Sequence, residues 1–295
     1  MSSSVPKIAF IGFGEAAQAF VSGWGDKPPG PISAFDIKTN TDASRVAKLA
    51  DYAACRVRGD NTLADALQDA DIVFSVVTAG NAQAAASQAA GLFPRGALFF
   101  DMNSVVPDTK RANAKAIEAA GGRYVDVGVM APVYPAQLRV PMLLAGPHAA
   151  QATETMRSIG FNTRCVGDDV GKAAAVKIIR SIMVKGMEAV TAECVLAAFA
   201  AGVEDEVMAS LTATWSNAAM PERADYNLDR MMVHGRRRAE EMRAATEMAK
   251  SLGLGGGMSA STAHWQDRIG ELELPADGDL RDKVAAILSA FQRGG

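Results

Sequence analysis

Residues 8–17 read IAFIGFGEAA, a short apolar run followed at once by the pattern Gly-x-Gly-x-x-Ala. The apolar run is typical of a buried strand, and the residues after Glu15 have a helical pattern. In a strand–turn–helix unit, Gly12 permits the tight turn, Gly14 lets backbone amides approach a pyrophosphate, and Ala17 allows the helix to pack closely on the sheet. The segment therefore predicts a phosphate-binding loop at the N-terminus of a helix.

A carboxylate follows the loop at the spacing of a dinucleotide site. Residues 32–35 predict a second strand, and Asp36 comes directly after it, about 20 residues beyond the glycines. Asp36 can accept hydrogen bonds from both hydroxyls of an adenosine ribose, and its charge would repel a 2′-phosphate. Lys38 and Arg45 follow closely and could offset that repulsion. The sequence thus favours NAD as the cofactor and leaves NADP open.

The first half of the chain alternates short apolar runs with Ala-rich helical stretches. This alternation is typical of strands joined by helical crossovers in a parallel sheet. We expect an α/β Rossmann domain that binds the dinucleotide and covers residues 1–166. Its predicted strands are residues 8–11, 32–35, 72–76, 97–101, 124–129 and 141–145.

From Gly171 onward the chain has long Ala, Met, Glu and Arg segments at helical spacing. We expect an all-α C-terminal domain over residues 167–295 that serves substrate binding and oligomerisation. Its first segment, residues 171–201, would form an interdomain helix about 45 Å long at 1.5 Å per residue. Because this helix is apolar on several faces, a second subunit is expected to cover part of it, in a homodimer or a higher even oligomer. The glycine run at 255–257 predicts a loop.

Composition argues against several classes of function. The 295 residues carry a formal net charge of −3, whereas sequence-independent nucleic-acid binding needs a strongly basic face. The three consecutive arginines at 236–238 are interpreted as a solvated helix face. Three widely spaced histidines and three widely spaced cysteines fit neither a metal site nor a disulfide framework, so we expect no metal and three buried thiols.

The chain also lacks the signs of export or membrane insertion. Residues 1–7 are short and polar, and the apolar run after them is soon broken by two glycines and a glutamate. The longest apolar helix candidate, residues 181–203, contains Lys185, Glu188 and Glu193. We therefore expect a cytoplasmic protein with no membrane partner.

One lysine stands in an apolar turn of the long helix. Lys177 is surrounded in sequence by Ala173, Ala174, Val176, Ile178 and Ile179. Partial burial would lower the pKa of its ammonium group toward the range that serves general acid/base catalysis. The alternative is an ordinary lysine whose aliphatic stem packs while its charge reaches water. Lys177 is therefore a candidate for the residue that moves a proton.

Four segments together resemble the β-hydroxyacid dehydrogenases, the family of the 3-hydroxyisobutyrate, tartronate semialdehyde and 6-phosphogluconate enzymes. They are residues 10–17, 101–107, 126–132 and 171–181, in the order and spacing of that family. Shorter stretches at 15–17, 129–132, 179–181 and 234–242 are similar to a branch labelled NAD-binding phosphogluconate dehydrogenase. The resemblance implies a Rossmann domain, a nicotinamide cofactor and a catalytic lysine.

The resemblance also implies roles for individual residues. Lys177 corresponds to the catalytic lysine, and Ser104 corresponds to a threonine on the cofactor side of the site. Val77 and Thr78 stand where the family has a Leu-Pro pair beside the nicotinamide. Glu240 replaces a lysine that touches the cofactor in many members, so no contact is assigned there. Motif and resemblance together place cofactor binding at Gly12, Phe13, Gly14, Glu15, Ala16, Ala17, Asp36, Lys38, Val77, Thr78, Asn103 and Ser104.

Other positions depart from the family, and they concern the substrate. Met130, Ala131 and Pro132 stand where the family has a Ser-Gly-Gly loop, and Ser181 replaces an asparagine. Ser181 is shorter than asparagine, so the expected pocket accepts a bulkier or less polar substrate. Arg180 offers an anion-binding fork or, equally, a salt bridge to another helix. The candidate substrate-binding residues are Ser104, Met130, Ala131, Pro132, Arg180 and Ser181.

These expectations lead to one main hypothesis and two alternatives. The chain is expected to be an NAD(P)-dependent oxidoreductase that moves a hydride between nicotinamide and a small hydroxy or carbonyl compound, with Lys177 as general acid/base. An imine reductase shares the architecture, but such enzymes more often have aspartate or tyrosine at the position of Lys177. The third hypothesis is a regulatory protein that binds the cofactor without turnover. The loss of the Ser-Gly-Gly loop favours it, and the retained lysine opposes it.

Overall fold

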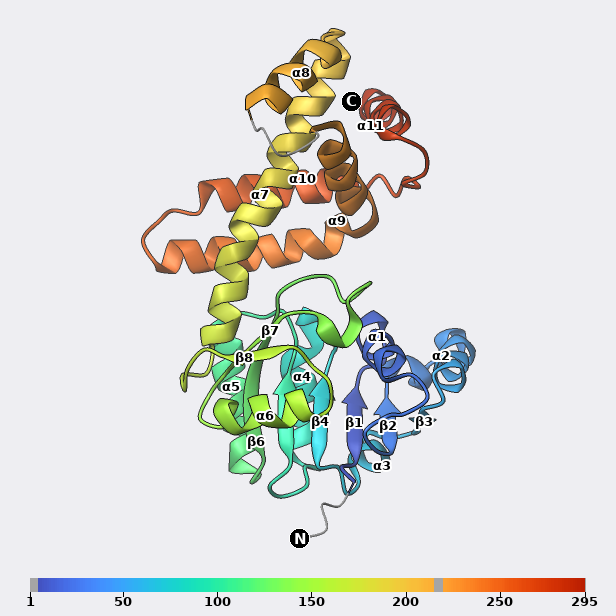
Figure 1. The fold of residues 1–295 in the computed structure, drawn as a ribbon, viewed down its shortest axis with the longest axis vertical. Coiled ribbons are helices and arrows are strands. Elements are labelled where there is room, and N and C mark those ends of the chain that lie inside the picture. The colour runs from blue at the N-terminus through green and yellow to red at the C-terminus, as the bar shows by residue number, and fades with distance from the viewer. Residues whose placement is uncertain (1–4, 215–219, 295) are drawn as a thin grey trace. The chain divides into compact units, whose positions relative to one another are not determined.

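An eight-stranded, mostly parallel sheet fills the first half of the computed structural model (Figure 1). The structure describes residues 5–214 and 220–294, which fall into two units, Met1–Lys177 and Ile178–Gly295. The strand order is β3-β2-β1-β4-β5-β6-β7-β8. The strands are β1 (Ile8–Ile11), β2 (Ile32–Phe35), β3 (Arg58–Gly59), β4 (Ile72–Ser75), β5 (Leu98–Asp101), β6 (Arg123–Val129), β7 (Met142–Ala145) and β8 (Thr163–Cys165). The arrangement confirms the predicted α/β Rossmann fold.

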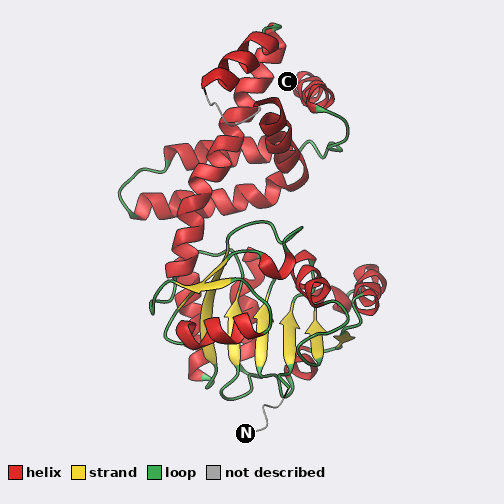
Figure 2. Cartoon of the chain, in the orientation of Figure 1, coloured by secondary structure: helices red, strands yellow, loops and turns green. Residues whose placement is uncertain are grey.

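Helices lie on both faces of this sheet (Figure 2). Successive side chains of a strand point to opposite faces of the sheet. Because helices cover both faces, the side chains of each apolar strand are buried on both sides. Phe10 and Phe74 belong to a core with α1, α2 and α6, whereas Val73 and Phe99 belong to a core with α3, α4 and α5. The helices are α1 (Glu15–Trp24), α2 (Asp42–Ala54), α3 (Leu63–Leu67), α4 (Ala82–Ala90), α5 (Pro107–Ala119) and α6 (Ala149–Ser158).

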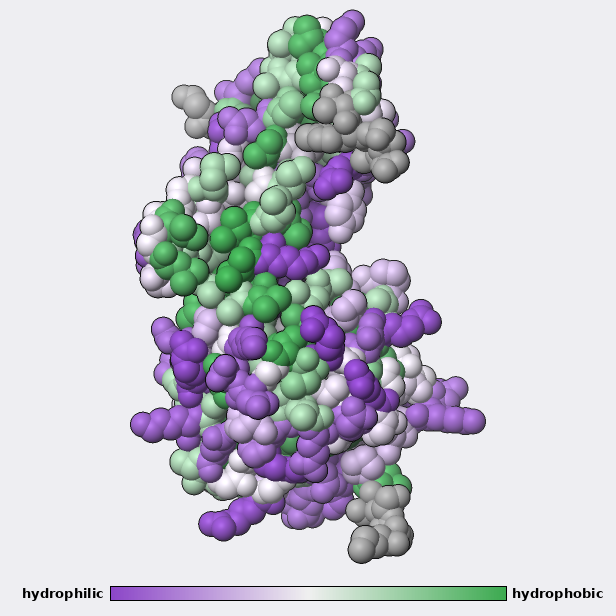
Figure 3. Space-filling view, turned by 60° about the vertical axis from the view of Figure 1, so that its left-hand side comes forward, coloured by the Kyte–Doolittle hydropathy of each residue, from purple (hydrophilic) through white to green (hydrophobic). Residues whose placement is uncertain are grey.

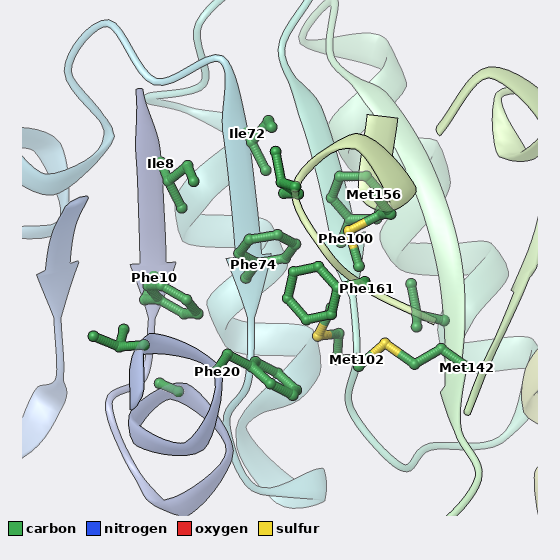
Figure 4. Packing of buried hydrophobic residues seen from close by; sticks show 14 of the residues in the cluster. Ile8, Phe10, Phe20, Ile72, Phe74, Phe100, Met102, Met142, Met156 and Phe161 are labelled. Atoms are coloured by element: carbon green, nitrogen blue, oxygen red, sulfur yellow. The ribbon is translucent and has the colours of Figure 1, made fainter. Parts of the chain in front are cut away.

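Aromatic rings hold the central strands together on one face of the sheet (Figure 4). Phe10, Phe74 and Phe100 occupy paired positions on β1, β4 and β5, and the ring centroids of neighbouring strands lie 5.3 Å apart. Phe161 adds a fourth ring, 5.6 Å from Phe74. Replacing one such buried phenylalanine with alanine costs about 3–5 kcal/mol. This core keeps the ends of β1, β4 and β5 in register.

Two features of the sheet differ from the sequence expectation of a parallel sheet. β7 runs antiparallel to β6, because the described residues 130–141 between them hold only a short 3-10 turn, η3 (Gln137–Arg139), and no crossover helix. β3 and β8 have no counterpart among the predicted strands, since they span two and three residues and carry the exposed arginines Arg58 and Arg164. The six predicted strands are confirmed, each within one residue at either end.

The second half of the chain is helical, as predicted. The long helix α7 (Lys172–Ala201) begins in the first unit, and its 30 residues make about 45 Å of helix. The other helices are α8 (Glu204–Thr214), α9 (Met220–Ser251), α10 (Gly257–Gly270) and α11 (Leu280–Gly294). Gly255 and Gly256, each with φ +73, lie in the loop between α9 and α10 as expected, whereas Gly257 is already the first residue of α10.

The predicted solvated arginine face is wrong for one of its three residues. Arg236 and Arg237 are exposed, but Arg238 is only 8% exposed and forms a buried ion pair with Glu188 of α7. Gln266 of α10 donates to the same carboxylate at 2.9 Å. A run of charges in sequence does not show which of its members lies on the packed side of a helix.

The three cysteines are free, and all three are half-buried, so the expectation of buried thiols overstates their burial. Within residues 5–214 and 220–294, no group of three His, Cys, Asp or Glu side chains is placed to hold a metal ion. None of the helices described is long and apolar enough to cross a membrane.

Candidate cofactor and active site

The central parallel strands all end at one edge of the sheet, and candidate residues follow each of them. Gly12 follows β1, Val77 lies just beyond β4, Asn103 lies just beyond β5, and Met130 follows β6. From β1 the chain adds β2 and then β3 on one side. It then returns to the other side of β1 and adds β4 and the later strands there, so the direction of building reverses between β1 and β4. Ligands of open α/β sheets bind at such a reversal, beside the carboxyl ends of the strands.

The glycine loop is closely packed on one side and open on the other. Gly12 has φ +86, and a Cβ there would lie 2.8 Å from the carbonyl oxygen of Val76, so glycine is required. A Cβ on Gly14 would meet no described atom within 4 Å. α1 begins at Glu15, and the amides of a first helical turn have no acceptor within the helix. A pyrophosphate therefore has room and donors beside Gly14, and these residues fit a dinucleotide.

Asp36 lies next to the glycine loop, where a ribose-binding carboxylate is expected. Its Oδ2 accepts the backbone N–H of Phe13 at 2.8 Å, and its Oδ1 accepts that of Lys38 at 2.9 Å. An ionised carboxylate has about four acceptor positions, so acceptor capacity is left for ribose hydroxyls. The side chain of Lys38 is exposed, and Arg45 donates to the Thr39 carbonyl and to Asn61. Both cations therefore lie close to Asp36 in the chain without an ion pair to it.

The loops after β4 and β5 are joined by one amide side chain. Asn103 is 4% exposed, and its Oδ1 accepts the backbone N–H of Val77 at 2.7 Å. Its Nδ2 donates to Ser75 Oγ at 2.9 Å and to Asp101 Oδ1 at 2.8 Å. Thr78 is exposed, and its hydroxyl accepts from the Asn81 amide at 2.9 Å. The predicted positions Val77 and Asn103 are thus in direct contact, and Ser104 follows them half-buried.

A buried charged cluster behind this edge was not among the candidate residues. Asp101, Lys110 and Asp126 are all fully buried, and Lys110 Nζ lies 3.1 Å from Asp101 and 3.4 Å from Asp126. Burial raises the pKa of Asp101, but Lys110 and hydrogen bonds from Asn113, Tyr124 and Asn103 outweigh it, so the pKa lies below its usual value. Asp126 stands inside an apolar strand, and that break in the pattern was the available signal.

Asp126 fastens the start of α7 to the sheet. Its Oδ2 accepts the backbone N–H groups of Gly171, Ala173 and Ala174 at 3.0, 3.0 and 3.2 Å. These amides carry the positive end of the helix dipole, which a carboxylate stabilises. Lys177, half-buried, lies three residues after Ala174 in the same helix. The structure therefore places the candidate lysine within one turn of an anchored helix start.

The close fit of α7 against β6 involves Met130 as well. A Cβ on Gly128 would lie 2.9 Å from the carbonyl oxygen of Ala173, so the helix start leaves no space at this point of the strand. Met130 packs in a cluster with Leu143, Ala145 and Ala173. Ala131 and Pro132 are exposed. Met130 thus packs where the start of α7 contacts the sheet, whereas the two residues after it lie at the surface.

The remaining substrate candidates belong to the second unit. Arg180 is exposed, and Ser181 is 7% exposed, with its Oγ accepting from Lys185 Nζ at 3.0 Å. Lys185 also pairs with Glu241 at 2.8 Å. Burial lowers the pKa of Lys185, against the opposing effect of Glu241. Glu241 of α9 is thus engaged with a lysine of α7.

Comparison with known protein families identifies the class. The model of the NAD binding domain of 6-phosphogluconate dehydrogenase matches residues 7–167, and the chain belongs to this family. A second model, for a domain of unknown function, matches residues 198–269. The family assignment confirms the resemblance drawn from the sequence motifs, and it supports binding of NAD(P) by the first unit.

Among individual relatives, the chain is 35% identical to a conserved hypothetical protein of Sinorhizobium meliloti 1021, with 98% of this chain and 97% of that chain covered and a TM-score of 0.75. An uncharacterised 28.5 kDa protein of Methanothermus fervidus is 25% identical, over 80% of this chain and 88% of its own length. The Mycobacterium tuberculosis 3-hydroxyisobutyrate dehydrogenase is 16% identical, with coverage of 97% and 99% and a TM-score of 0.72. At that identity the likeness shows the fold alone.

Proposed function

We propose that the chain is an NAD(P)-dependent oxidoreductase that interconverts a hydroxy compound and its carbonyl, with Lys177 as the general acid/base. The observation that carries the proposal is the anchoring of the Lys177 helix by Asp126 at the sheet edge that also holds the glycine loop. A lysine on a firmly held helix start can keep its amine in a reproducible position. The family assignment supports the cofactor half of the proposal.

The mechanism divides the work between cofactor and chain. When bound, the nicotinamide supplies the hydride acceptor or donor. In oxidation, neutral Lys177 Nζ takes the proton of the substrate hydroxyl as the carbinol hydride leaves; in reduction, the ammonium returns that proton to the carbonyl oxygen. Val77 and Asn103 shape the wall beside the strand ends, and Ser104 can orient a polar group through its hydroxyl.

Replacing Lys177 with methionine tests the proposal directly. Lys177→Met is expected to lower turnover by about 10²- to 10⁴-fold, the range for loss of general acid/base assistance, and to leave NADH affinity unchanged. The assay follows NADH absorbance over a panel of hydroxy acids, other alcohols, their carbonyl forms and cyclic imines. Lys172→Met makes the same change at the exposed first residue of α7 and should keep full activity. Equal turnover in wild type and Lys177→Met would refute the assignment.

The substrate proposed is less polar than a small hydroxyacid. Met130 and Ser181 occupy positions where the family has a serine and an asparagine, and Met130 packs in an apolar cluster. Fewer hydrogen-bond donors then remain for a carboxylate. Arg180, exposed on α7, is the proposed cation for any anionic group on the substrate.

NAD is the proposed cofactor, because Asp36 lies beside the glycine loop and its negative charge would repel a 2′-phosphate there. Both Asp36 oxygens are fixed by backbone amides, so the side chain cannot swing away without losing two hydrogen bonds. Lys38 and Arg45 keep NADP as the second choice.

We also infer that α7 binds a second copy of the chain. Val176, Ile179, Met183 and Val190 are exposed by 40, 48, 69 and 53%, and their spacing of three, four and seven residues places them on one side of the helix. Apolar surface is also exposed over the helices of the second half of the chain, where it is green in Figure 3. An apolar stripe of this length is typical of a helix–helix interface between subunits.

A further inference from the structure

The backbone of Phe13 is held on both sides of its Cα, once through its N–H and once through its carbonyl oxygen. The N–H of Phe13 donates to Asp36 Oδ2 at 2.8 Å, and the carbonyl oxygen of Phe13 accepts from Lys48 Nζ at 2.6 Å. Gln18 Nε2 adds a longer contact to the same oxygen at 3.4 Å. Phe13 itself is fully buried. The middle residue of the glycine loop therefore has both of its backbone polar groups fixed by charged side chains.

The direction of one carbonyl fixes the direction of the next amide. In a trans peptide the C=O and the N–H of one unit point opposite ways. Since Lys48 draws the Phe13 carbonyl toward α2, the N–H of Gly14 must point away from Lys48. Gly14 is the loop residue around which a Cβ would meet no described atom within 4 Å. The Gly14 amide is therefore turned away from Lys48, and the open space beside the Gly14 Cα leaves room for a pyrophosphate near it.

Lys48 is placed unusually for a residue of a surface helix. It belongs to α2, in which Arg45, Val46, Ala47 and Leu49 are exposed, yet its side chain is only 7% exposed. Its ammonium contacts Asp51 Oδ2 at 2.6 Å in addition to the Phe13 carbonyl. Withdrawing an ammonium from water costs free energy unless such partners compensate. The burial thus brings a cation directly behind the loop at which an anion is expected.

We propose that Lys48 is a positioning residue of the pyrophosphate site. It keeps the Phe13 carbonyl, a negative end of a dipole, turned away from the anion, and it presents the Gly14 N–H to that anion. The inference rests on the dinucleotide binding in the proposed function and is independent of the role of Lys177. Without Lys48, the Phe13 carbonyl oxygen loses the main hydrogen bond that it accepts. The peptide between Phe13 and Gly14 can then rotate, and the pyrophosphate would lose the preorganised N–H of Gly14.

The test separates the pyrophosphate from the rest of the nucleotide. ADP and adenosine are the probes, because both offer the ribose hydroxyls to Asp36 and only ADP carries the pyrophosphate. Lys48→Met is expected to weaken ADP binding by about tenfold or more, the effect of losing one hydrogen bond to a charged group, with adenosine affinity unchanged. Calorimetry measures ADP, and NMR titration at millimolar concentrations measures adenosine. Lys48→Arg keeps a charged donor and should recover most of the ADP affinity.

Controls distinguish positioning from a general loss of structure. Lys115→Met makes the same substitution at an exposed lysine of α5 and should bind both probes as wild type does. If Lys48→Met does not yield folded protein, Lys48→Gln replaces it, because glutamine keeps a buried polar donor of shorter reach. This variant is likewise expected to weaken ADP binding and to leave adenosine affinity unchanged. Unchanged ADP affinity, or equal losses for ADP and adenosine, overturns the inference. Wild-type protein that binds neither NADH nor ADP overturns the proposed function instead.

Discussion

Both oxygens of Asp36 accept a backbone N–H, one from Phe13 and one from Lys38, so the carboxylate has a fixed orientation beside the glycine loop, at the position proposed for the ribose. Asp36→Asn would keep an oxygen acceptor for Phe13 and remove the negative charge. We expect the ratio of the NADPH and NADH dissociation constants to fall by about tenfold, because repulsion of the 2′-phosphate disappears while Lys38 and Arg45 remain. Fluorescence titration of both reduced cofactors measures the ratio.

A change of the same charge elsewhere serves as the control for Asp36. Asp69→Asn removes a carboxylate whose side chain is 68% exposed and should leave the ratio as in wild type. A wild-type ratio in Asp36→Asn as well would mean that Asp36 does not discriminate between the cofactors.

The position of Asp36 beside the glycine loop could be predicted from the sequence, whereas that of Lys48 could not. Asp36 could be predicted, because the spacing from the glycines is a local property of one strand–helix–strand unit. Lys48 could not, because a lysine in a helix with exposed neighbours normally extends its charge into water. Only the packing of α2 beside the loop shows that the Phe13 carbonyl lies within its reach. A contact between residues that are far apart in the chain, such as that of Lys48 with Phe13, has no characteristic spacing in the sequence.

At the scale of single elements, α7 depends on an anchor 45 residues upstream, since Asp126 accepts the N–H of Gly171 at its start. Asp126→Ala would remove the acceptor for three amides and leave Lys110 with one carboxylate fewer. We expect the free energy of unfolding to fall by about 3 kcal/mol or more, as for other broken buried charge pairs. Urea unfolding followed by circular dichroism provides the measurement.

The matched control for this anchor is an exposed acid at another helix start. Asp108 lies in the first turn of α5 and pairs with Arg111 at the surface. Asp108→Ala is expected to cost less than about 1 kcal/mol. Similar losses of stability in the two variants would contradict the anchoring role of Asp126.

Elements differ in predictability for a related reason. The six central strands and α7 could be predicted, since apolar runs and helical spacing are written along the chain itself. The antiparallel direction of β7 was missed, although the short loop before it, with Pro132 and Pro135, favoured this direction. A parallel crossover needs about a dozen residues or more and usually a helix. The burial of Arg238 could not be predicted, because it depends on α9 facing Glu188 of α7. Pairing between elements, more than their existence, requires the structure.

At the scale of the whole molecule, the apolar stripe of α7 defines the proposed contact with a second copy. Met183 and Val190 are its two most exposed members, at 69 and 53%. Burying side chains of this size stabilises an interface by about 1.5–3 kcal/mol each, and two symmetric copies would contribute every residue twice. Wild-type protein is therefore expected to sediment as a dimer or a higher even oligomer at micromolar concentration.

A charge placed in the stripe should separate the subunits. The double variant Met183→Glu with Val190→Glu is expected to be monomeric in sedimentation equilibrium, because a glutamate buried at a symmetric interface faces its own copy or loses its hydration. Val46→Glu introduces the same charge on α2 at a position 78% exposed, outside the stripe, and should remain oligomeric. An oligomer that persists in the double variant would show that another surface joins the subunits. A monomeric wild type would contradict the proposal that α7 binds a second copy of the chain.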